Sequence, residues 1–261
     1  MCLSLVAVGL HPLYPLIVLS NRDEFYQRAS TPAHFWPDNP GLFAGMDLVA
    51  GGTWLGVNTE GKISLVTNYR NPAFHSKNMQ SRGLLVKNFL ANHHFAPELY
   101  IAELTKKALQ YNPFNLIFGT VNNLYHYSNI THVGTKLTSN LYGISNELLD
   151  TPWFKVQRAK QLFTQAMAKL IRHEDPNFIS EMLYPVLEDK VLAPDNLLPS
   201  TGVPKEIEKS LSSIFVTIPD YEYGTRSSNI ILFKQEQLFF FEKTYLDEQL
   251  INNEVTSINI N

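Results

Sequence analysis

Short apolar runs separated by turn residues occur at both ends of the chain, and each run is typical of a β-strand. The first two runs cover residues 2–8 and 16–21, with a turn from Gly9 to Pro15 between them. Both are apolar at nearly every position, which indicates strands covered on both faces. They predict a hairpin inside a layered protein.

Further hairpins are predicted in the middle and at the end of the chain. Residues 51–58 and 62–68 flank the turn Thr59-Glu60-Gly61, in which Gly61 can take the positive φ of a tight turn. The polar tail after Asp247 is predicted to fray or to form a short edge strand. The other predicted strands cover 115–120, 123–128, 213–217, 226–233 and 238–245.

The stretch from Ala29 to Gly45 is predicted to be an irregular loop, because it contains three prolines. It also contains Phe35, Trp36 and Phe43. Aromatic residues in such a loop more often pin it to the body of the protein than line a pocket. We therefore expect a pinned loop.

Four segments have the apolar spacing of helices. Ser81 is the predicted N-cap of the first, Pro97 opens the second, and Thr151 is the predicted N-cap of the third. In the second, a stripe that includes Leu99 and Leu109 predicts a face packed on the core. The helices cover 82–90, 97–111, 152–171 and 177–187.

The order of these elements decides the fold class. Strands and helices follow one another in blocks, and the strand pairs are hairpins. A doubly wound parallel fold would need strand and helix to alternate one by one. The pattern therefore predicts an α+β protein, a four-layer αββα sandwich of two antiparallel sheets flanked by helices, as one domain over residues 1–261.

Composition narrows the class of protein. Of the 261 residues, 44% are hydrophobic and 17% charged, enough for a substantial core and too little charge for disorder. A net charge of −3 gives no basic footprint for nucleic acid or an anionic membrane surface. No apolar run approaches the roughly 20 residues of a membrane span, and the N-terminus does not resemble a signal peptide. We expect a cytoplasmic protein, and the sequence leaves its oligomeric state open.

The only cysteine is the clearest chemical feature. Cys2 directly follows Met1, so removal of the methionine would place a thiol and a free α-amino group on one residue. The amine has a reference pKa of about 7.7–8.0 and the thiol of about 8.5, so the amine can act as the base that forms the thiolate. Position alone leaves an equal alternative, in which Cys2 is a small buried residue of an apolar strand.

Four consecutive polar residues, Asn21-Arg22-Asp23-Glu24, end the second predicted strand. In a regular strand Asn21 and Asp23 share one face, and Arg22 and Glu24 share the other. In the hairpin this run would lie beside Cys2, where Asp23 could hold the α-amino group. Asn21 could donate a hydrogen bond to substrate or backbone. A solvated strand end is the alternative, and four polar residues alone favour it.

Several motifs together resemble the NRDE family, that of the transport and Golgi organisation protein 2. This family is similar in turn to N-terminal nucleophile (Ntn) hydrolases of the choloylglycine hydrolase and penicillin V acylase type. The resemblance implies their αββα fold. It rests on Met1-Cys2, Asn21-Arg22-Asp23-Glu24, Gly51-Gly52-Thr53-Trp54-Leu55-Gly56, Val66-Thr67-Asn68-Tyr69-Arg70, Tyr142-Gly143-Ile144-Ser145-Asn146 and Tyr223-Gly224-Thr225-Arg226-Ser227-Ser228, in that order.

The resemblance also implies roles for individual residues. Cys2 would be the nucleophile, and Asp23 the carboxylate that orients its amine. Asn68 and Asn146 would contribute to an oxyanion hole, and Arg226 would favour the thiolate. The residues assigned to substrate binding are Asn21, Arg22, Trp54 and Tyr69.

One departure from the hydrolase pattern concerns a further arginine. The hydrolases carry an arginine three residues before the aspartate, and here that position is Ser20. Arg22 is adjacent to Asp23 instead, and a regular strand would direct it to the other face. The departure bears on catalysis more than on the fold.

The leading hypothesis is an enzyme that cleaves a non-peptide amide or a thioester, such as an acyl-CoA, through an acyl-Cys2 intermediate. The NRDE family is also linked to haem trafficking and to lipid or acyl-CoA handling, which implies as the alternative a carrier without turnover. No cofactor is required, and haem would be cargo. The histidines have no spacing typical of a metal site.

Overall fold

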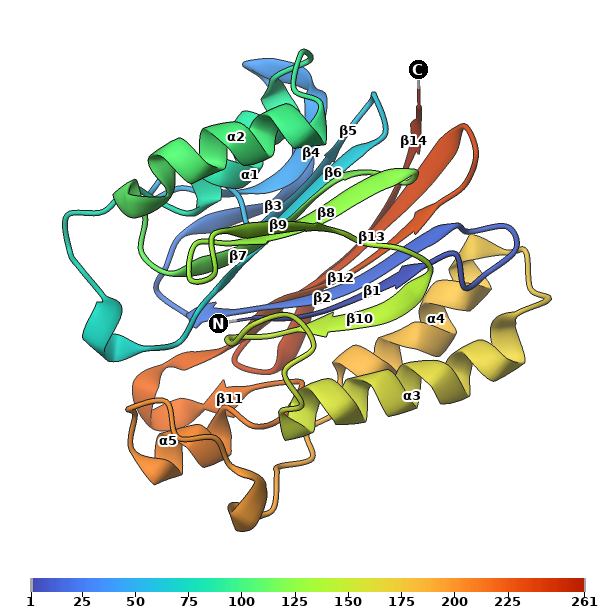
Figure 1. Cartoon of the computed structure of the whole chain (residues 1–261). Helices are drawn as coiled ribbons and strands as arrows, with labels where there is room; N and C mark the ends of the chain where they lie inside the picture. The colour runs from blue at the N-terminus through green and yellow to red at the C-terminus, as the bar shows by residue number, and fades with distance from the viewer. Residues whose placement is uncertain (1, 261) are drawn as a thin grey trace. The chain divides into compact units, whose positions relative to one another are not determined.

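The structure is a computed structural model that describes residues 2–260, with the side chain of Cys2 excepted. Its elements form two compact units, one of Met1–Gln27 and Ser139–Ile258, the other of Arg28–Thr138 and Asn259–Asn261. Each unit contains one antiparallel sheet with helices against it (Figure 1). The predicted α+β class with two antiparallel sheets is confirmed, and the single domain over residues 1–261 stays a prediction.

The sheet of the first unit has the strand order β10-β1-β2-β12-β13-β14, and a short strand, β11, pairs with β12. The predicted N-terminal hairpin is confirmed, because β1 and β2 pair antiparallel. Strand β12 lies on the other side of β2, although the two are far apart in the sequence (Figure 1). The bounds are β1 Cys2–Val8, β2 Leu16–Phe25, β10 Asn140–Ile144, β11 Thr217–Ile218, β12 Tyr223–Phe233, β13 Gln237–Leu246 and β14 Gln249–Asn259.

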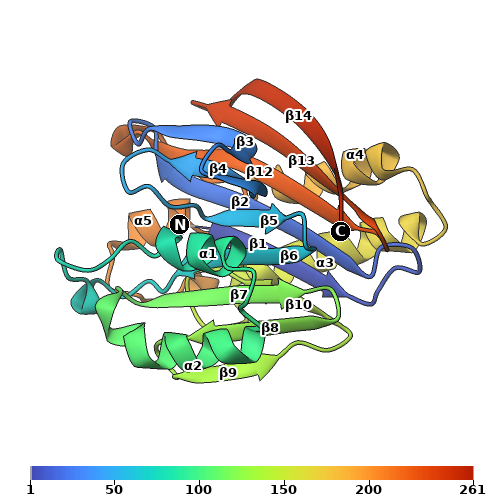
Figure 2. The ribbon, with the colours of Figure 1, turned by 90° about the horizontal axis from the view of Figure 1, so that it is seen from above.

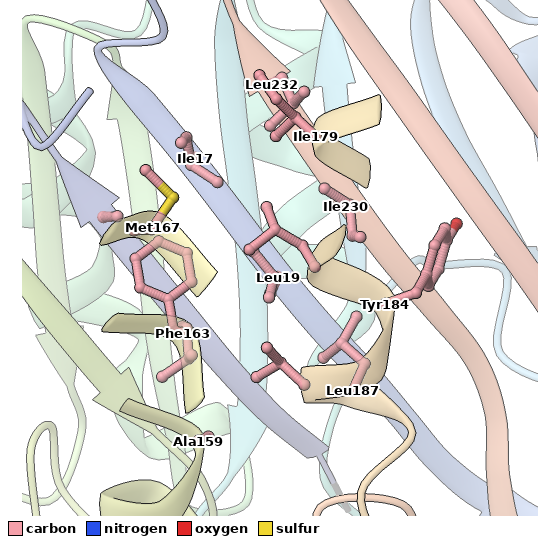
Figure 3. Packing of buried hydrophobic residues seen from close by; sticks show 14 of the residues in the cluster. Ile17, Leu19, Ala159, Phe163, Met167, Ile179, Tyr184, Leu187, Ile230 and Leu232 are labelled. Carbon is pink, nitrogen blue, oxygen red and sulfur yellow. The ribbon is translucent and has the colours of Figure 1, made fainter. Parts of the chain in front are cut away.

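Two helices, α3 (Phe154–Leu170) and α4 (Pro176–Leu187), cover one face of this sheet. Alternate strand residues such as Ile17, Leu19 and Ile230 pack against them in one apolar cluster (Figure 3). Because side chains alternate along a strand, the intervening residues belong to the opposite face. A shorter helix, α5 (Lys205–Ser210), precedes β11.

The sheet of the second unit has the order β3-β4-β5-β6-β7-β8-β9. Two helices, α1 and α2, lie side by side on one face of it (Figures 1 and 2). They pack on a cluster of aromatic and aliphatic residues that includes Phe89, Tyr100 and Phe118. The bounds are β3 Ser30–Trp36, β4 Asn39–Asp47, β5 Leu55–Asn58, β6 Lys62–Asn68, α1 Gly83–Ala91, α2 Pro97–Lys107, β7 Phe114–Thr120, β8 Asn123–Ser128 and β9 Val133–Lys136.

The predicted loop from Ala29 to Gly45 is wrong, because this stretch forms the hairpin of β3 and β4. Strand β3 is at the edge of its sheet, and its register shifts between Thr31 and His34. Proline is tolerated at such a position, where a missing N–H removes no ladder hydrogen bond. The pinning role of the aromatic residues holds for Trp36, which is buried and donates from Nε1 to the carbonyl of Ala44 at 3.0 Å.

Two predicted helix caps are wrong. The N-cap of α1 is Arg82 rather than Ser81, and that of α3 is Trp153 rather than Thr151. Neither observed cap residue makes a side-chain cap hydrogen bond, so capping chemistry does not mark the starts of these helices.

The apolar stripe predicted for the second helix is also wrong in part. Leu99 and Leu109 are 60% and 82% exposed. Leu104, which belongs to the predicted stripe, is buried, and Tyr100 is buried in addition. The helix gives way to a 3-10 turn over Ala108–Gln110. The tighter turn rotates the following side chains out of the register of an α-helix. Other 3-10 turns cover Pro72–Phe74, Asp195–Leu197 and Pro219–Tyr221.

The tail after Asp247 forms an edge strand, as one of the two predictions had it, but the strand is not short, because 11 residues form β14. A two-residue turn joins β13 to β14, and both of its residues, Asp247 and Glu248, have positive φ values of 47° and 64°. Paired positive φ values are typical of a type I′ hairpin turn, which usually contains Asn or Gly. The turn carries neither residue, so the sequence shows no hairpin signal here.

Gly52 allows a close backbone contact with α1, and we expect its substitution to lower the stability of the fold. A Cβ on Gly52 would lie 2.5 Å from the carbonyl carbon of Gly83, at the start of α1. We expect Gly52→Ala to lower the free energy of unfolding by about 1–3 kcal/mol, since the backbone contact cannot relax cheaply. Urea unfolding measures this, with Gly41→Ala as the control, because the side chain of Thr59 is the main neighbour there. Equal losses in both variants would contradict this role.

Candidate functional site

Three strand ends meet at one end of the first unit's sheet. The β1–β2 register sets Cys2 opposite Arg22, so the start of β1 lies beside the polar run that ends β2. On the other side of β1, Ser4 pairs with Ile144, the last residue of β10. Asn146 follows two residues later, and the same register continued would set it opposite Cys2. The hairpin prediction that placed the chain start beside the polar run is confirmed.

The polar run is buried rather than solvated. Asn21, Arg22 and Asp23 are 0%, 4% and 1% exposed, and Glu24 is half-buried. The alternative of a solvated strand end is therefore wrong. Burying three such side chains in succession is costly unless each has polar partners.

Asn21 holds distant segments to the sheet. Its Nδ2 donates to the carbonyls of Leu187 and Ile214, at 2.8 and 3.0 Å, and its Oδ1 accepts from the hydroxyl of Ser228 at 2.7 Å. Of the two roles open to Asn21, donation to backbone is the one observed. Its assignment to substrate binding stays a prediction.

Asp23 is held by two residues of β12. Its Oδ1 accepts from the hydroxyl of Thr225 at 2.8 Å, and its backbone carbonyl accepts from the hydroxyl of Tyr223 at 2.9 Å. Burial raises the pKa of the Asp23 carboxyl above its usual value, and the Lys155 ammonium and the Thr225 hydrogen bond oppose this shift. A buried carboxylate with a displaced pKa beside a cation is typical of a functional site.

Lys155 is a site residue that the sequence reasoning missed. It lies in the first turn of α3 and is 2% exposed. An ammonium this deeply buried needs an anion nearby, and Asp23 is close enough for Lys155 to lower its pKa. A signal was present, because Lys155 occupies the same stripe of the helix as Ala159 and Phe163, both core residues.

Arg22 belongs to the sheet face that α3 and α4 do not cover. Its register partner on β12 is Ser227, and residues directly opposite each other share a face. Ser20 belongs to the same face and contacts the hydroxyl of Ser4 at 2.8 Å. The expectation that Arg22 and Asp23 lie on opposite faces agrees with this register. Arg22 is, however, the register partner of Cys2.

This polar face continues across β12 and β13. The hydroxyl of Ser227 donates to Asn229 Oδ1 at 3.3 Å, and Asn229 Nδ2 donates to Glu242 Oε1 at 3.1 Å. All three residues are at most 4% exposed. Buried polar groups linked in this way fix the positions of their neighbours more firmly than isolated pairs do.

Arg226 lies at a β-bulge, because the β2–β12 register shifts between Thr225 and Ser227. Its Nη1 donates to the carbonyls of Tyr26 and Phe25, at 2.6 and 3.3 Å. Its Nε donates to the carbonyl of Tyr245 at 3.2 Å, and burial lowers the pKa of the guanidinium. Through these hydrogen bonds Arg226 connects the ends of β2 and β13. The effect of Arg226 on a thiolate stays a prediction.

Three predicted site residues belong to the second unit, where they lie at one end of its sheet. Asn68 is the last residue of β6 and is half-buried, and Tyr69 follows it. Trp54 immediately precedes β5, and its carbonyl accepts from the backbone N–H of Val66 at 2.9 Å. The ring of Trp54 fills the space above Gly45, where a Cβ would lie 2.5 Å from it. The roles of these three residues stay predictions.

Among the side chains of residues 3–260, no three of His, Asp or Glu are placed to share a metal ion. In the same part of the chain, no helix has the length and apolar character needed to cross a bilayer.

Comparisons with known proteins give a family and a fold. A family model described as Transport and Golgi organisation 2 matches residues 1–247. The chain is 32% identical over 256 residues to the Transport and Golgi organization protein 2 homolog of Bos taurus, which covers 94% of this chain and 91% of the relative. It is 33% identical over 250 residues to the homolog of Homo sapiens, covering 91% of this chain and 89% of the relative.

The comparison with solved structures finds a similar fold at low sequence identity. A mutant of conjugated bile acid hydrolase from Clostridium perfringens has a TM-score of 0.52 at 11% identity, over 100% of this chain and 97% of that structure. At this identity the likeness shows the fold alone. The fold is that of an N-terminal nucleophile hydrolase, as the sequence resemblance implied.

Proposed function

The chain belongs to the Transport and Golgi organisation 2 family and has an Ntn-hydrolase fold, and from this premise we propose that it is an N-terminal cysteine hydrolase. After removal of Met1, the Cys2 thiolate attacks the carbonyl carbon of a non-peptide amide or a thioester. The bond to the amine or thiol leaving group breaks, and that group takes up a proton. Water then hydrolyses the acyl-Cys2 intermediate and regenerates the thiol.

The buried carboxylate of Asp23 is the observation that carries this proposal. Because β1 runs antiparallel to β2 and Cys2 is opposite Arg22, the backbone nitrogen of Cys2 is on the side of this residue that is nearer to Asp23. A free α-amino group on Cys2 would therefore form next to a carboxylate that burial disfavours. An N–H of that amine would donate a hydrogen bond to the Asp23 carboxylate. The carboxylate would in turn hold the amine in a fixed orientation.

Lys155 explains how the amine can still act as a base. A carboxylate alone would raise the pKa of a neighbouring amine and keep it protonated. The ammonium of Lys155 offsets the charge of Asp23, so the amine sits beside a nearly neutral pair. Its pKa then stays close to that of the thiol, and it can accept the thiol proton.

Arg22 and Asn146 supply the remaining parts of the proposed site. Register partners share a sheet face, so Arg22 provides the cation that favours a thiolate, in place of the arginine that is absent at Ser20. Asn146, at the end of β10, donates to the oxyanion that forms when the carbonyl is attacked. Asn68 belongs to the second unit, and its role as an oxyanion donor stays a prediction.

The intact mass of untagged protein tests the first requirement. We expect the chain to lack Met1, because the mechanism needs the free amine of Cys2. After brief incubation with a panel of acyl thioesters, a fraction of the chain should carry one acyl group on Cys2. Quantitative retention of Met1 in the native protein would contradict the N-terminal nucleophile.

A binding experiment distinguishes an enzyme from a carrier. The alternative proposal is a protein that binds haem or an acyl-CoA as cargo without turnover. Titration of wild-type protein and Cys2→Ala with haem and with an acyl-CoA then decides. Stoichiometric binding that survives the substitution, with no acyl release by either protein, would favour the carrier.

A further inference from the structure

Strand β14 ends the first unit's sheet, with β13 on one side and no strand of that sheet on the other within residues 2–260 (Figure 2). It is 11 residues long. Edge strands are usually kept short or protected by charges, prolines or bulges, because their free N–H and C=O groups pair with any other strand. Glu254 is the only charged residue of β14, and the strand contains no proline.

Large apolar side chains line this edge. Leu250, Ile251 and Val255 are 52%, 60% and 54% exposed. Single exposed apolar residues are ordinary, whereas a group along an unpaired strand marks an interaction site. Since side chains alternate, Ile251 and Val255 share one face of β14, and Leu250 belongs to the other.

We propose that β14 pairs antiparallel with the same strand of a second copy of this chain, about a two-fold axis at Asn253. In this register Ile251 faces the partner's Val255, and Asn253 faces the partner's Asn253. Glu254 faces the partner's Asn252. The contact is isologous, so it closes after two copies and does not propagate into a fibre.

The side chains favour this register over those with an axis at either neighbouring residue. It forms two Ile–Val cross-strand pairs and one Asn–Asn pair, both of which stabilise antiparallel strands. An axis at Glu254 would set that carboxylate against its own copy. An axis at Asn252 would set Leu250 against the partner's Glu254. The register about Asn253 avoids both conflicts.

The length of β14 sets the strength of the expected contact. In this register nine residues of each strand, 249–257, pair, and at about 3.4 Å per residue they span about 31 Å. A contact along one strand edge of this length is well below the roughly 1,600 Å² of a standard specific interface. We therefore expect a dimer with a dissociation constant in the micromolar range rather than a permanent one.

Sedimentation equilibrium across a concentration series tests the dimer. Wild-type protein should be dimeric at tens of micromolar, and Ile251→Lys should raise the dissociation constant at least tenfold. Leu109→Lys is the matched control, because Leu109 is 82% exposed on the second unit and should leave dimerisation unchanged. A monomeric wild type at 100 µM, or a dimer indifferent to Ile251→Lys, would overturn the proposal.

Cross-linking tests the register. In a Cys2→Ser background, Asn253→Cys should form an intermolecular disulfide under mild oxidation, because opposed residues of antiparallel strands have Cα atoms about 4.5–5.5 Å apart. Thr256→Cys in the same background should not, since its own copy would lie about six residues away along the strand. Equal cross-linking of both variants, or of neither, would overturn the register. These tests need no catalytic activity, so their outcome is independent of the proposed hydrolase function.

Discussion

Cys2→Ala is expected to lower the rate of thioester cleavage by about 10³-fold or more, because it removes the group that forms the covalent intermediate. The thiol released from an acyl thioester is measured with a chromogenic disulfide. Cys2→Ser should fall similarly, since an alcohol is a far weaker nucleophile than a thiol near neutral pH. Both variants should unfold at the same urea concentration as wild type, because each substitution alters only the Sγ position of one residue at the start of β1.

Blocking the N-terminus distinguishes the contribution of the Cys2 thiol to the rate from that of its amine. The wild-type chain with a non-cleavable N-terminal extension keeps the thiol of Cys2 and turns its amine into an amide. The proposed mechanism makes this protein as inactive as Cys2→Ala, while general thiol chemistry would leave it active. Full activity of the extended chain, or of Cys2→Ala, would refute a nucleophile that depends on its own amine.

The parts of this fold that the sequence predicts are those specified by residues close together in the chain. The hairpin of β5 and β6 is an example, because Gly61 supplies the positive φ of 73° that its turn needs. The hairpin of β13 and β14 lacked such a residue and was missed. The strand β3 was hidden by Pro32, since tolerance of a proline depends on the strand being at an edge.

The candidate site likewise has a part that local sequence predicts and a part that depends on contacts between distant segments. Cys2 and Asp23 were paired by reasoning on one hairpin, and the observed register agrees with that pairing. The partners of Asp23 could not be read from the sequence, because Thr225 is 202 residues away and reaches Asp23 only through the pairing of β2 with β12. Helical spacing indicates that Lys155 belongs to the core stripe of α3, but its position beside Asp23 depends on the packing of α3 on the sheet, which spacing alone does not reveal.

The second prediction concerns the buried charges of Asp23 and Lys155: removing both should restore the stability that each single substitution lowers, but not the activity. Asp23→Asn and Lys155→Met should each lower the rate of acyl release, by about 10²-fold or more for Asp23→Asn, because the amine loses its orienting group. Each single variant should also destabilise the fold, since it leaves one charge buried without its counterpart. The double variant should regain stability and remain inactive.

Linkage gives the sign of the stability difference with pH. Burial raises the pKa of Asp23 in the folded state, so between about pH 3.9 and that raised value the folded chain binds more protons at this site than the unfolded chain. The contribution of Asp23 to stability is therefore greatest below this range and falls as the pH rises through it. Urea unfolding should show wild type losing stability relative to the double variant over the same range.

The pH profile of Lys155→Met tests the catalytic part of the argument. Without the ammonium of Lys155, the Asp23 carboxylate acts on the α-amine of Cys2 alone and raises its pKa, so the ascending limb of kcat/KM should move to higher pH by about one unit or more. Lys155→Arg keeps the charge and should restore the wild-type profile, which recovery of packing alone would not do. A Lys155→Met profile that falls in amplitude without moving would limit Lys155 to a structural role and leave the amine without its proposed electrostatic partner.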